Sequence, residues 1–289
     1  MSRLQGRTAF ITGATRGIGL AIGEALAAEG ANIVVIGKTT EPHPKLPGTI
    51  YTAAEAIEKA GGQALPIACD IRDEARVQAA VDQAVERFGG IDILVNNASA
   101  IFPRSTADTP IKRWDLMHSI NARGTFLVTQ RCLPHLQKSD NPHILVMSPP
   151  LDMREKWFAP NVAYTSSKYG MSLCVLGWAG EFRGRIAANA LWPRTAIATA
   201  AVANVLAGEE VFMACRKPTI LADAALRIVL KDAKTFTGNF LIDDSFLVSE
   251  GVTDLDQYSV QQGVPLLPDF FVPEEPGVPE GVVMSDIQL

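Results

Sequence analysis

The stretch Thr12-Gly13-Ala14-Thr15-Arg16-Gly17-Ile18-Gly19 follows a short β-branched run, Thr8–Thr12, and leads into a segment of helical period. Glycines in it remove Cβ atoms, so the backbone can turn tightly and approach a phosphate group closely. The first turn of a helix offers unpaired N–H groups at its positive end. A glycine-rich turn in this strand-to-helix position predicts a dinucleotide-binding α/β domain. The predicted pyrophosphate contacts are Gly13, Thr15, Arg16, Gly17, Ile18 and Gly19.

Six further short apolar runs alternate along the chain with longer segments of helical period. Several of them lack polar alternation, which is typical of parallel strands covered on both faces. The alternation predicts a single Rossmann-type, doubly wound α/β domain with about seven parallel strands and helices on both faces. The six runs are Asn32–Ile36, Ala64–Cys69, Ile91–Val95, His143–Ser148, Ala187–Leu191 and Asn239–Ile242.

Helix ends are also visible in the sequence. The first helix carries an apolar face and is expected to end at Gly30, a residue suited to a C-terminal cap. Thr52-Ala53-Ala54-Glu55 has the pattern of a capping box and predicts the start of the second helix, which stops at Gly61-Gly62. A third apolar stripe precedes Gly89-Gly90. These faces are expected to pack on the sheet.

Two proline-rich stretches depart from the regular alternation. Thr39–Gly48 is favoured as a rigid surface loop over a contact with a partner or substrate. From Pro265 onward, prolines and acidic residues predict an extended, weakly ordered tail. The expected organisation is therefore a domain over residues 1–264 and a tail over residues 265–289.

The bulk properties narrow the class of protein. The net charge of -5 argues against a general nucleic-acid binder, which needs a basic surface. No apolar run approaches the ~20 residues of a membrane span, and the N-terminus lacks the apolar core of a signal peptide. Four scattered cysteines predict reduced thiols, and the histidines show no metal-ligand spacing. A cytoplasmic protein without a metal centre is predicted.

The end of the second predicted strand bears on which nicotinamide cofactor binds. An acidic residue there would accept hydrogen bonds from the adenosine ribose of NAD. This sequence has Ile36-Gly37-Lys38-Thr39 instead, and Lys38 would attract a 2′-phosphate that a carboxylate would repel. Arg16 can reach the same region from the first turn. Although each could be an ordinary exposed cation, their joint placement favours NADP(H).

Tyr164 and Lys168 stand four residues apart and would share one helix face, about 6 Å apart along the axis. With an ordinary pKa of ~10, a tyrosine is a poor acid or base at neutral pH. A nearby ammonium group and a positive nicotinamide ring would lower the pKa of Tyr164. The same lysine can hold the nicotinamide ribose. The pair alone is common in helices and gains meaning only beside the glycine turn.

Together with Asn96-Asn97-Ala98 after the fourth strand, these motifs resemble the short-chain dehydrogenase/reductase superfamily from Thr8 to about Asp243. The resemblance implies that Asp70 contacts adenine and that Asn97 and Ala98 lie beside the cofactor. It implies that Asn121 holds a proton-relay water and that Tyr164 and Lys168 form the catalytic pair. It also implies a homo-oligomer, a dimer or tetramer, built through helices around Ala122–Leu136 and Tyr164–Phe182.

Within that superfamily the chain is most similar to a hydroxysteroid dehydrogenase-like group, whose eukaryotic members carry a C-terminal sterol-carrier domain that is not expected here. The resemblance rests on three stretches: 43–51, 147–150 and 191–197. Two positions depart from the superfamily pattern. Ser148-Pro149 places the only candidate catalytic serine one position early, and Arg194 replaces the usual glycine. Arg194 could narrow the pocket or bind an anionic substrate, or it could equally point to solvent.

The sequence therefore predicts an NADP(H)-dependent oxidoreductase acting on a carbonyl/alcohol pair, with an apolar or lipid-like substrate. Asn121, Ser148, Tyr164 and Lys168 are its candidate catalytic residues, and Met153–Pro160 and Thr195–Cys215 are expected to cover the site as mobile loops. A non-catalytic NADP(H)-binding sensor or scaffold is the alternative suggested by the displaced serine. An enoyl reductase fits less well, because the four-residue Tyr–Lys spacing suits carbonyl chemistry better.

Overall fold

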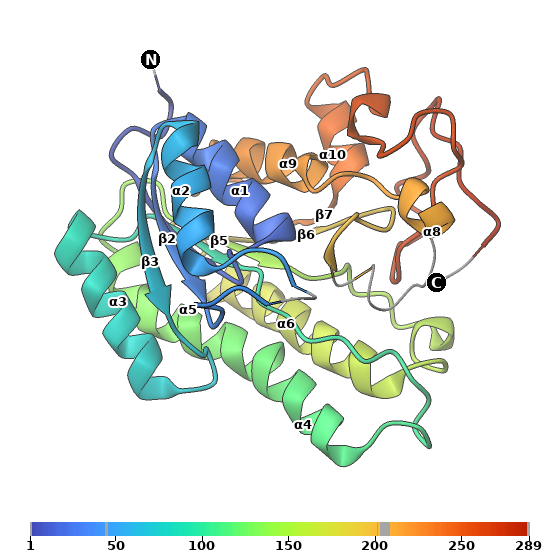
Figure 1. Cartoon of the computed structure of the whole chain (residues 1–289), viewed down its shortest axis with the longest axis horizontal. Coiled ribbons are helices and arrows are strands. Elements are labelled where there is room, and N and C mark those ends of the chain that lie inside the picture. Colours follow the sequence, from blue (N-terminus) through green and yellow to red (C-terminus); the bar gives the residue numbers. More distant parts are fainter. Residues whose placement is uncertain (1, 44–45, 201, 203–208, 288–289) are drawn as a thin grey trace.

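The computed structural model describes residues 2–43, 46–200, 202 and 209–287 (Figure 1). Within these ranges seven strands form one parallel sheet in the order β3-β2-β1-β4-β5-β6-β7. The predicted doubly wound α/β fold is confirmed, and each predicted run contains a strand whose ends differ by at most two residues. The strands are β1 Thr8–Thr12, β2 Asn32–Gly37, β3 Gln63–Ala68, β4 Ile93–Asn96, β5 His143–Met147, β6 Ala187–Trp192 and β7 Phe240–Ile242.

The order of the strands reverses between β1 and β4, which pair in parallel with Ala9 opposite Ile93 and Ile11 opposite Val95. Chain connections leave β1 toward β2 and leave β4 toward β5, so the loops after these two strands diverge. A reversal of this kind opens a crevice at the carboxyl edge of the sheet, where α/β proteins bind their ligands.

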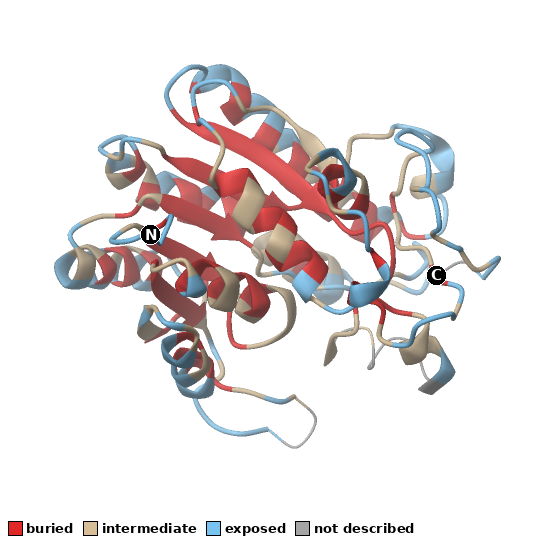
Figure 2. Ribbon diagram, turned by 90° about the horizontal axis from the view of Figure 1, so that it is seen from above, coloured by how far each residue is buried: buried red, intermediate tan, exposed pale blue. Residues whose placement is uncertain are grey.

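Helices cover both faces of the sheet (Figures 1 and 2), and each face has its own apolar core. One face is covered by α1 Gly17–Ala28, α2 Ile50–Ala60, α9 Thr219–Val229 and α10 Asp243–Ser249. The other is covered by α3 Glu74–Phe88, α5 Ala122–Leu136 and α6 Val162–Glu181, with α4 Ile111–Ile120 packed beside α5 and α6. The shorter helices are α8 Glu209–Met213 and the 3₁₀ turns Glu155–Trp157 and Asp256–Tyr258.

The predicted capping box of α2 is wrong. The helix begins at Ile50, and its N-cap is Thr49, whose hydroxyl accepts the N–H of Thr52 at 3.2 Å. The Thr52 hydroxyl in turn accepts the N–H of Thr49 at 2.8 Å, so the box joins Thr49 and Thr52 rather than Thr52 and Glu55. Burial explains the earlier start, because Ile50 is only 1% exposed and joins the core beneath α1 and α2.

The C-terminal segment is not the weakly ordered tail that its prolines suggest. Leu266, Leu267 and Phe271 are buried, and residues 265–287 fold back over the carboxyl edge of the sheet (Figure 1). Leu267 donates its N–H to Ala214 and accepts that of Ala196. Apolar side chains between the prolines provide the burial that composition alone does not reveal. The division of the chain at residue 264 stays a prediction.

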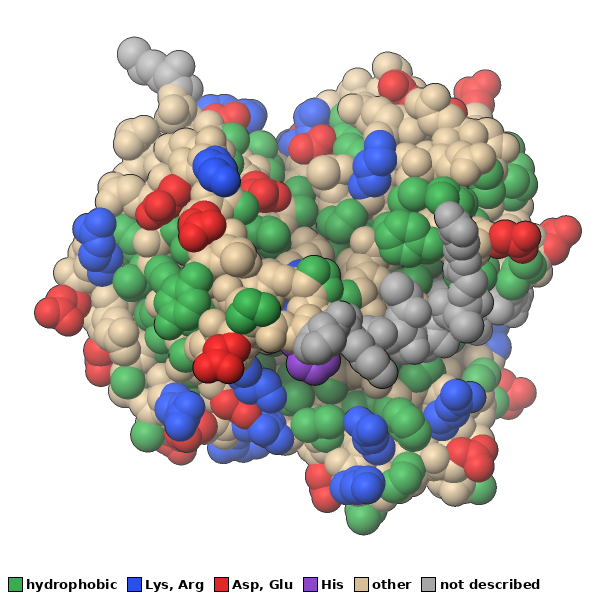
Figure 3. Space-filling view, viewed as in Figure 1, with side chains coloured by type: hydrophobic (Ala, Val, Ile, Leu, Met, Phe, Trp, Pro, Cys, Tyr) green, Lys and Arg blue, Asp and Glu red, His purple; other side chains and the backbone are tan. Residues whose placement is uncertain are grey.

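No helix in the described part of the chain is both long and apolar enough to pass through a bilayer. On the face shown in Figure 3, basic and acidic side chains are interspersed over the surface. Such mixing produces little field of a single sign on that face.

Candidate active site

The glycine turn after β1 is held against the end of β4. Gly13 has φ +66°, and a Cβ there would lie 2.9 Å from Ala98 Cα. A Cβ on Gly19 would lie 2.5 Å from Asn97 Nδ2, which donates to the carbonyls of Thr12 and Gly13 at 3.0 Å. Arg16, the N-cap of α1, makes no side-chain cap, so the N–H groups of the first turn stay available to a phosphate.

Thr12 has a role that the sequence interpretation missed. Its hydroxyl accepts the backbone N–H groups of both Asn97 and Ala98 at 3.0 Å and lies 3.3 Å from the carbonyl of Val95. The side chain therefore ties the end of β1 to the end of β4 directly beneath the glycine turn. The sequence feature that could have indicated this role is a threonine at the end of an apolar strand, directly before a glycine.

A cleft of about 420 Å³ opens at this edge, above the strand reversal. Nine of the residues predicted to bind the cofactor line this cleft. Gly19, which was also predicted, packs against Asn97 and does not line the cleft. Thr39, Leu46, Thr199 and Ala200 also line the cleft and were not predicted. The predicted residues in its lining are Gly13, Thr15, Arg16, Gly17, Ile18, Lys38, Asp70, Asn97 and Ala98.

At the end of the cleft where adenosine binding is predicted, Asp70 lies between two cations. Lys38 Nζ lies 3.6 Å and Arg72 Nη2 2.6 Å from Asp70 Oδ2. The hydrogen bonds from Arg72 hold the pKa of the Asp70 carboxyl well below its usual range, so the group is ionised at neutral pH. Arg72 was not predicted. Lys38 and Arg72 carry two positive charges against the single negative charge of Asp70, so this corner has a net positive charge.

Arg16 builds the wall of the cleft beside this corner. Its guanidinium donates to the carbonyls of Pro47 and Gly48 and to the hydroxyl of Thr39, at 2.6 to 3.1 Å. The loop predicted as a rigid surface element therefore contributes to the cofactor cleft through its two ends. Residues 44 and 45 of that loop lie outside the described residues.

Tyr164 and Lys168 lie one turn apart on α6, as predicted. Lys168 Nζ donates to the carbonyl of Met147 at 2.7 Å and lies 4.9 Å from the ring centroid of Trp192. Met147 ends β5, next to β4, so the lysine is fixed at the edge that carries the cleft. Burial lowers the pKa of Lys168 to about 7.

Asn121 lies between α4 and α5, completely buried. Its carbonyl oxygen accepts the N–H of Ala100 at 2.8 Å, and its amide donates to the Ala100 carbonyl and the Ser167 hydroxyl at 2.9 Å. The side chain joins the segment after β4 to the helix that carries Tyr164. This position supports a role in holding the pocket together.

Ser148 follows β5 and is completely buried, and its hydroxyl has no hydrogen-bond partner among the described residues. The next residue, Pro149, has a carbonyl that accepts the hydroxyl of Ser172 on α6 at 2.6 Å. A buried hydroxyl without a partner costs free energy and is available to a ligand.

Tyr164 is covered by the C-terminal segment. Its side chain is 4% exposed, and its ring centroid lies 6.2 Å from that of Phe270 and 5.9 Å from that of Phe271. Burial raises the pKa of Tyr164, and the carboxylate of Asp269 raises it further. The predicted lowering refers to the site with a nicotinamide ring bound and stays a prediction. Phe270, Phe271 and Asp269 come from a segment that the sequence interpretation placed outside the domain.

The expectation that Arg194 points to solvent is wrong. Its guanidinium is buried, with Nε 2.8 Å from Asp244 Oδ1. Nη2 donates to the carbonyls of Pro276 and Gly277 at 3.1 and 3.0 Å. Arg194 therefore anchors the C-terminal segment to the sheet. Asp244, the acidic partner that holds the Arg194 side chain, is 50 residues away in sequence.

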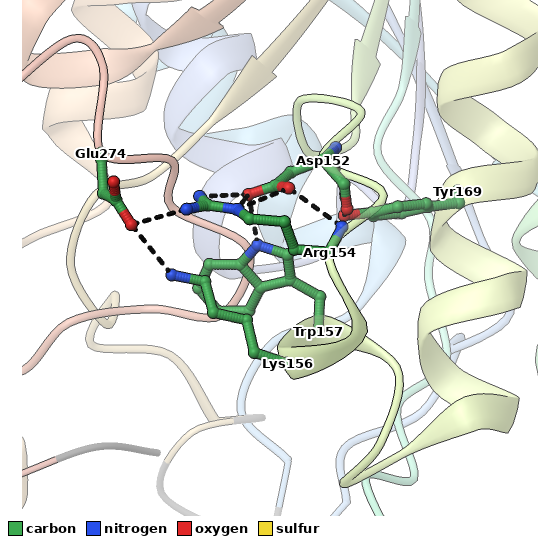
Figure 4. Close-up of polar contacts among 6 residues, drawn as sticks. All are labelled: Asp152, Arg154, Lys156, Trp157, Tyr169 and Glu274. Atoms are coloured by element: carbon green, nitrogen blue, oxygen red, sulfur yellow. Dashed lines mark hydrogen bonds and ion pairs between the residues drawn. The ribbon is translucent and has the colours of Figure 1, made fainter.

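A polar cluster joins the loop after β5 to the C-terminal segment (Figure 4). Asp152 accepts hydrogen bonds from Arg154 and from Trp157 Nε1, and its backbone carbonyl accepts the hydroxyl of Tyr169. Glu274 reaches across to Arg154 at 2.6 Å. The predicted covering loop Met153–Pro160 is thus held in place. Parts of the second predicted covering loop, including Val205 and Leu206, lie outside the described residues.

The cleft, the glycine turn and the Tyr–Lys pair occupy one edge of a doubly wound sheet, and residues 7–210 match the short chain dehydrogenase family. The chain belongs to the short-chain dehydrogenase family. Members of this family are oxidoreductases that use nicotinamide cofactors. Among curated proteins it is 59% identical over 274 residues to hydroxysteroid dehydrogenase-like protein 2 of Danio rerio. The match covers 95% of this chain but 66% of the relative, so the chain spans less than two thirds of that protein.

Solved structures have the same fold. A short chain dehydrogenase of Mycobacterium thermoresistibile is 52% identical to this chain with a TM-score of 0.89, and the match covers 97% of this chain and 99% of that protein's chain. A metagenomic short-chain oxidoreductase in complex with NADP is 25% identical with a TM-score of 0.68, covering 83% and 98%. A 7α-hydroxysteroid dehydrogenase with NADH and 7-oxo glycochenodeoxycholic acid is 30% identical with a TM-score of 0.72, covering 83% and 93%. Both nicotinamide cofactors therefore occur among the relatives.

Proposed function

We propose that this protein transfers a hydride between NADP(H) and a carbonyl/alcohol substrate of apolar or lipid-like character. The observation that carries the proposal is the bond from Lys168 Nζ to the carbonyl of Met147. It fixes the Tyr–Lys helix at the end of β5, beside the β4 end whose Asn97 lines the cofactor cleft. The family relationship supports the reaction class, and the two side chains supply a route for the proton.

The glycine turn fits a dinucleotide, because the space that a Gly13 Cβ would fill is closed by the Ala98 backbone and the α1 N–H groups stay open. The bound cofactor supplies or accepts the hydride. Tyr164 protonates the carbonyl oxygen in reduction and takes the proton back in oxidation. Lys168, once charged, favours the phenolate and holds the cofactor ribose.

Two further side chains complete the proposed mechanism. Ser148 hydrogen-bonds the substrate oxygen, a role supported by its buried and unpartnered hydroxyl. Asn121 keeps a relay water in place for the proton that Tyr164 loses. Its side chain is held by Ala100 and Ser167, so its main chain is fixed at the junction of two helices.

The preference for NADP(H) rests on the charges beside Asp70. Lys38 and Arg72 both contact this carboxylate, and Arg16 lies in the same wall. No acidic residue ends β2, where an NAD-dependent enzyme would bind the ribose hydroxyls. A 2′-phosphate would therefore meet a net positive site.

Replacing Tyr164 by phenylalanine tests the chemistry. The Tyr164→Phe variant should bind NADPH with wild-type affinity, measured by cofactor fluorescence, and lose turnover by about 100-fold or more on a verified carbonyl substrate. Tyr258→Phe, which removes a hydroxyl bonded to Asp223 far from the cleft, is the matched control and should keep its activity. Wild-type turnover in Tyr164→Phe would contradict the mechanism.

A non-catalytic NADP(H) sensor is the second candidate, and the covered position of Tyr164 favours it. A panel of carbonyl compounds followed at the NADPH absorbance separates the two functions. Tight NADPH binding with persistent absence of turnover on every compound would favour the sensor.

The same proposal includes a homo-oligomer, a dimer or tetramer, in the cytoplasm. Phe126 on α5 and Leu173 and Leu176 on α6 are exposed to 50–58%, a group of apolar side chains that a second copy would cover. All four cysteines are free, which fits a reducing compartment. Sedimentation equilibrium of the purified chain tests the assembly.

A further inference from the structure

Residues 266–277, which we call the cover, lie across the pocket that contains Tyr164. The first four residues of the cover are fixed by backbone hydrogen bonds and bridges to residues 194–196 after β6, to Ala214 and to residues 283–285. The remainder is attached mainly through side chains. Trp192 Nε1 donates to the Phe270 carbonyl at 2.7 Å, and Arg194 donates to Pro276 and Gly277. The cover therefore has a fixed base and a tip held by a few contacts.

Phe271 is the innermost residue of the tip. It is 0% exposed and has φ +65°, the only positive φ of a non-glycine residue in the described part of the chain. A non-glycine residue in this left-handed region costs free energy and persists only where the surrounding contacts hold it. Its ring fills an aromatic box, with centroid distances of 5.6 to 6.0 Å to Tyr164, Tyr169, Trp157, Trp192 and Phe270.

Glu274 closes the tip over the rim of this box. Its carboxylate lies 2.6 Å from Arg154 Nη1 and 3.5 Å from Lys156 Nζ, both on the loop after β5 (Figure 4). The Glu274 side chain is 75% exposed. Exposed ion pairs are weak and are screened by salt, so these contacts can exchange for another anion.

The tip thus places an aromatic ring beside Tyr164 and a carboxylate at Lys156 and Arg154 on the rim, where Arg154 is also paired with Asp152. A carbonyl oxygen must come within about 3 Å of the Tyr164 hydroxyl to be protonated. Phe271 occupies the space beside that side chain, so an apolar substrate body and the Phe271 ring compete for one box.

We infer that the tip of the cover is an internal ligand with the form of the substrate, and that it must leave before turnover. Phe271 takes the place of an apolar body, and Glu274 takes the place of an anionic group that Arg154 and Lys156 bind. The substrate class is accordingly an apolar carbonyl compound that carries a negative charge. This inference rests on the proposed function and adds the class of substrate and the control of its access.

The pKa of Tyr164 with the tip in place is consistent with a blocked site. With the cover in place, burial and the carboxylate of Asp269 raise the pKa of Tyr164, which opposes formation of the phenolate. Departure of the tip removes the part of this burial that Phe270 and Phe271 provide, whereas Asp269 stays with the fixed base through its backbone hydrogen bond to Arg194. The closed form therefore blocks the substrate and also disfavours proton transfer.

Two fluorescent probes with the same ring system test the inference without any turnover. 1-Anilinonaphthalene-8-sulfonate is apolar and anionic, and N-phenyl-1-naphthylamine is its uncharged counterpart. Phe271→Ala should bind both probes about tenfold more tightly than the wild type. Phe271→Leu should show a smaller gain and serves where the alanine variant does not fold. Phe236→Ala, the same change in a ring packed against Phe246 and away from the box, is the control.

The charge of the ligand is tested by Glu274→Gln. This variant should bind the anionic probe up to about fivefold more tightly at low salt and the uncharged probe with little change. Glu275→Gln, an adjacent exposed acid without an ion pair among the described residues, should match the wild type. High salt should remove the difference between Glu274→Gln and the wild type.

The inference is overturned if Phe271→Ala and Phe271→Leu bind the probes no better than the Phe236→Ala control. The anionic class is overturned if Glu274→Gln favours both probes equally or neither. These readouts are independent of the Tyr164→Phe result, because probe binding requires no catalysis. On a verified substrate, Glu274→Gln should lower KM at unchanged NADPH affinity, whereas Tyr164→Phe lowers kcat.

Discussion

Asp244 is the site of the most demanding prediction, because its carboxylate is shared by two buried arginines. Arg194 Nε lies 2.8 Å and Arg216 Nη1 2.9 Å from its oxygens. Arg216 is 0% exposed and has no other acidic partner among the described residues. Asp244→Asn keeps the shape of the side chain and removes the charge.

The expected loss is about 3–4 kcal/mol of unfolding free energy. Removing one partner of a buried ion pair costs roughly 3–5 kcal/mol, because the remaining charge stays buried and uncompensated. Asp243, whose pKa is raised by burial and by the neighbouring Asp244 carboxylate, can then ionise and offset part of the loss. For a chain of this size the loss corresponds to a fall in Tm of about 5–7 °C.

Urea unfolding followed by circular dichroism measures the change. Glu74→Gln, the same acid-to-amide change at the exposed ion pair with Arg131, is the control and should cost at most about 1 kcal/mol. An Asp244→Asn variant that loses less than about 1 kcal/mol at an unchanged m-value would refute the reasoning. The two arginines would then not depend on this carboxylate.

Two further predictions concern Lys38 in the cleft and Asp269 in the cover. Lys38→Ala should weaken NADPH binding about tenfold and leave NADH binding unchanged in fluorescence titrations, whereas the exposed Lys59→Ala should affect neither; equal effects on both cofactors would show that Lys38 does not read the 2′-phosphate. Burial raises the pKa of Asp269 to about 7, so the folded protein binds a proton that the unfolded chain releases near pH 4, and stability should fall by about 3 kcal/mol as pH rises from 4 to 7. Asp269→Asn should flatten this part of the pH–stability curve measured by urea unfolding, and an unchanged slope would exclude Asp269 as its source.

Local patterns in the sequence were sufficient for the sheet and for most of the cofactor cleft. Apolar runs that are easily recognised in the sequence form the strands before the glycine turn, Lys38 and Asp70. Parallel strands bring their carboxyl ends to the same edge of the sheet. The Tyr164–Lys168 spacing is also local, since a helix places residues four apart on one face. These features depend on neighbours within a turn or a strand.

The cover and the position of Arg194 were decided only by the tertiary structure. Proline content correctly indicates little regular structure after residue 264, but it cannot show that Phe271 is buried against Tyr164. Arg194 finds Asp244 and Pro276 across 50 and 82 residues of sequence. The physical reason is that a strand or helix pattern records hydrogen bonds between near neighbours, whereas the partner of a buried ring or charge depends on which distant segments pack together.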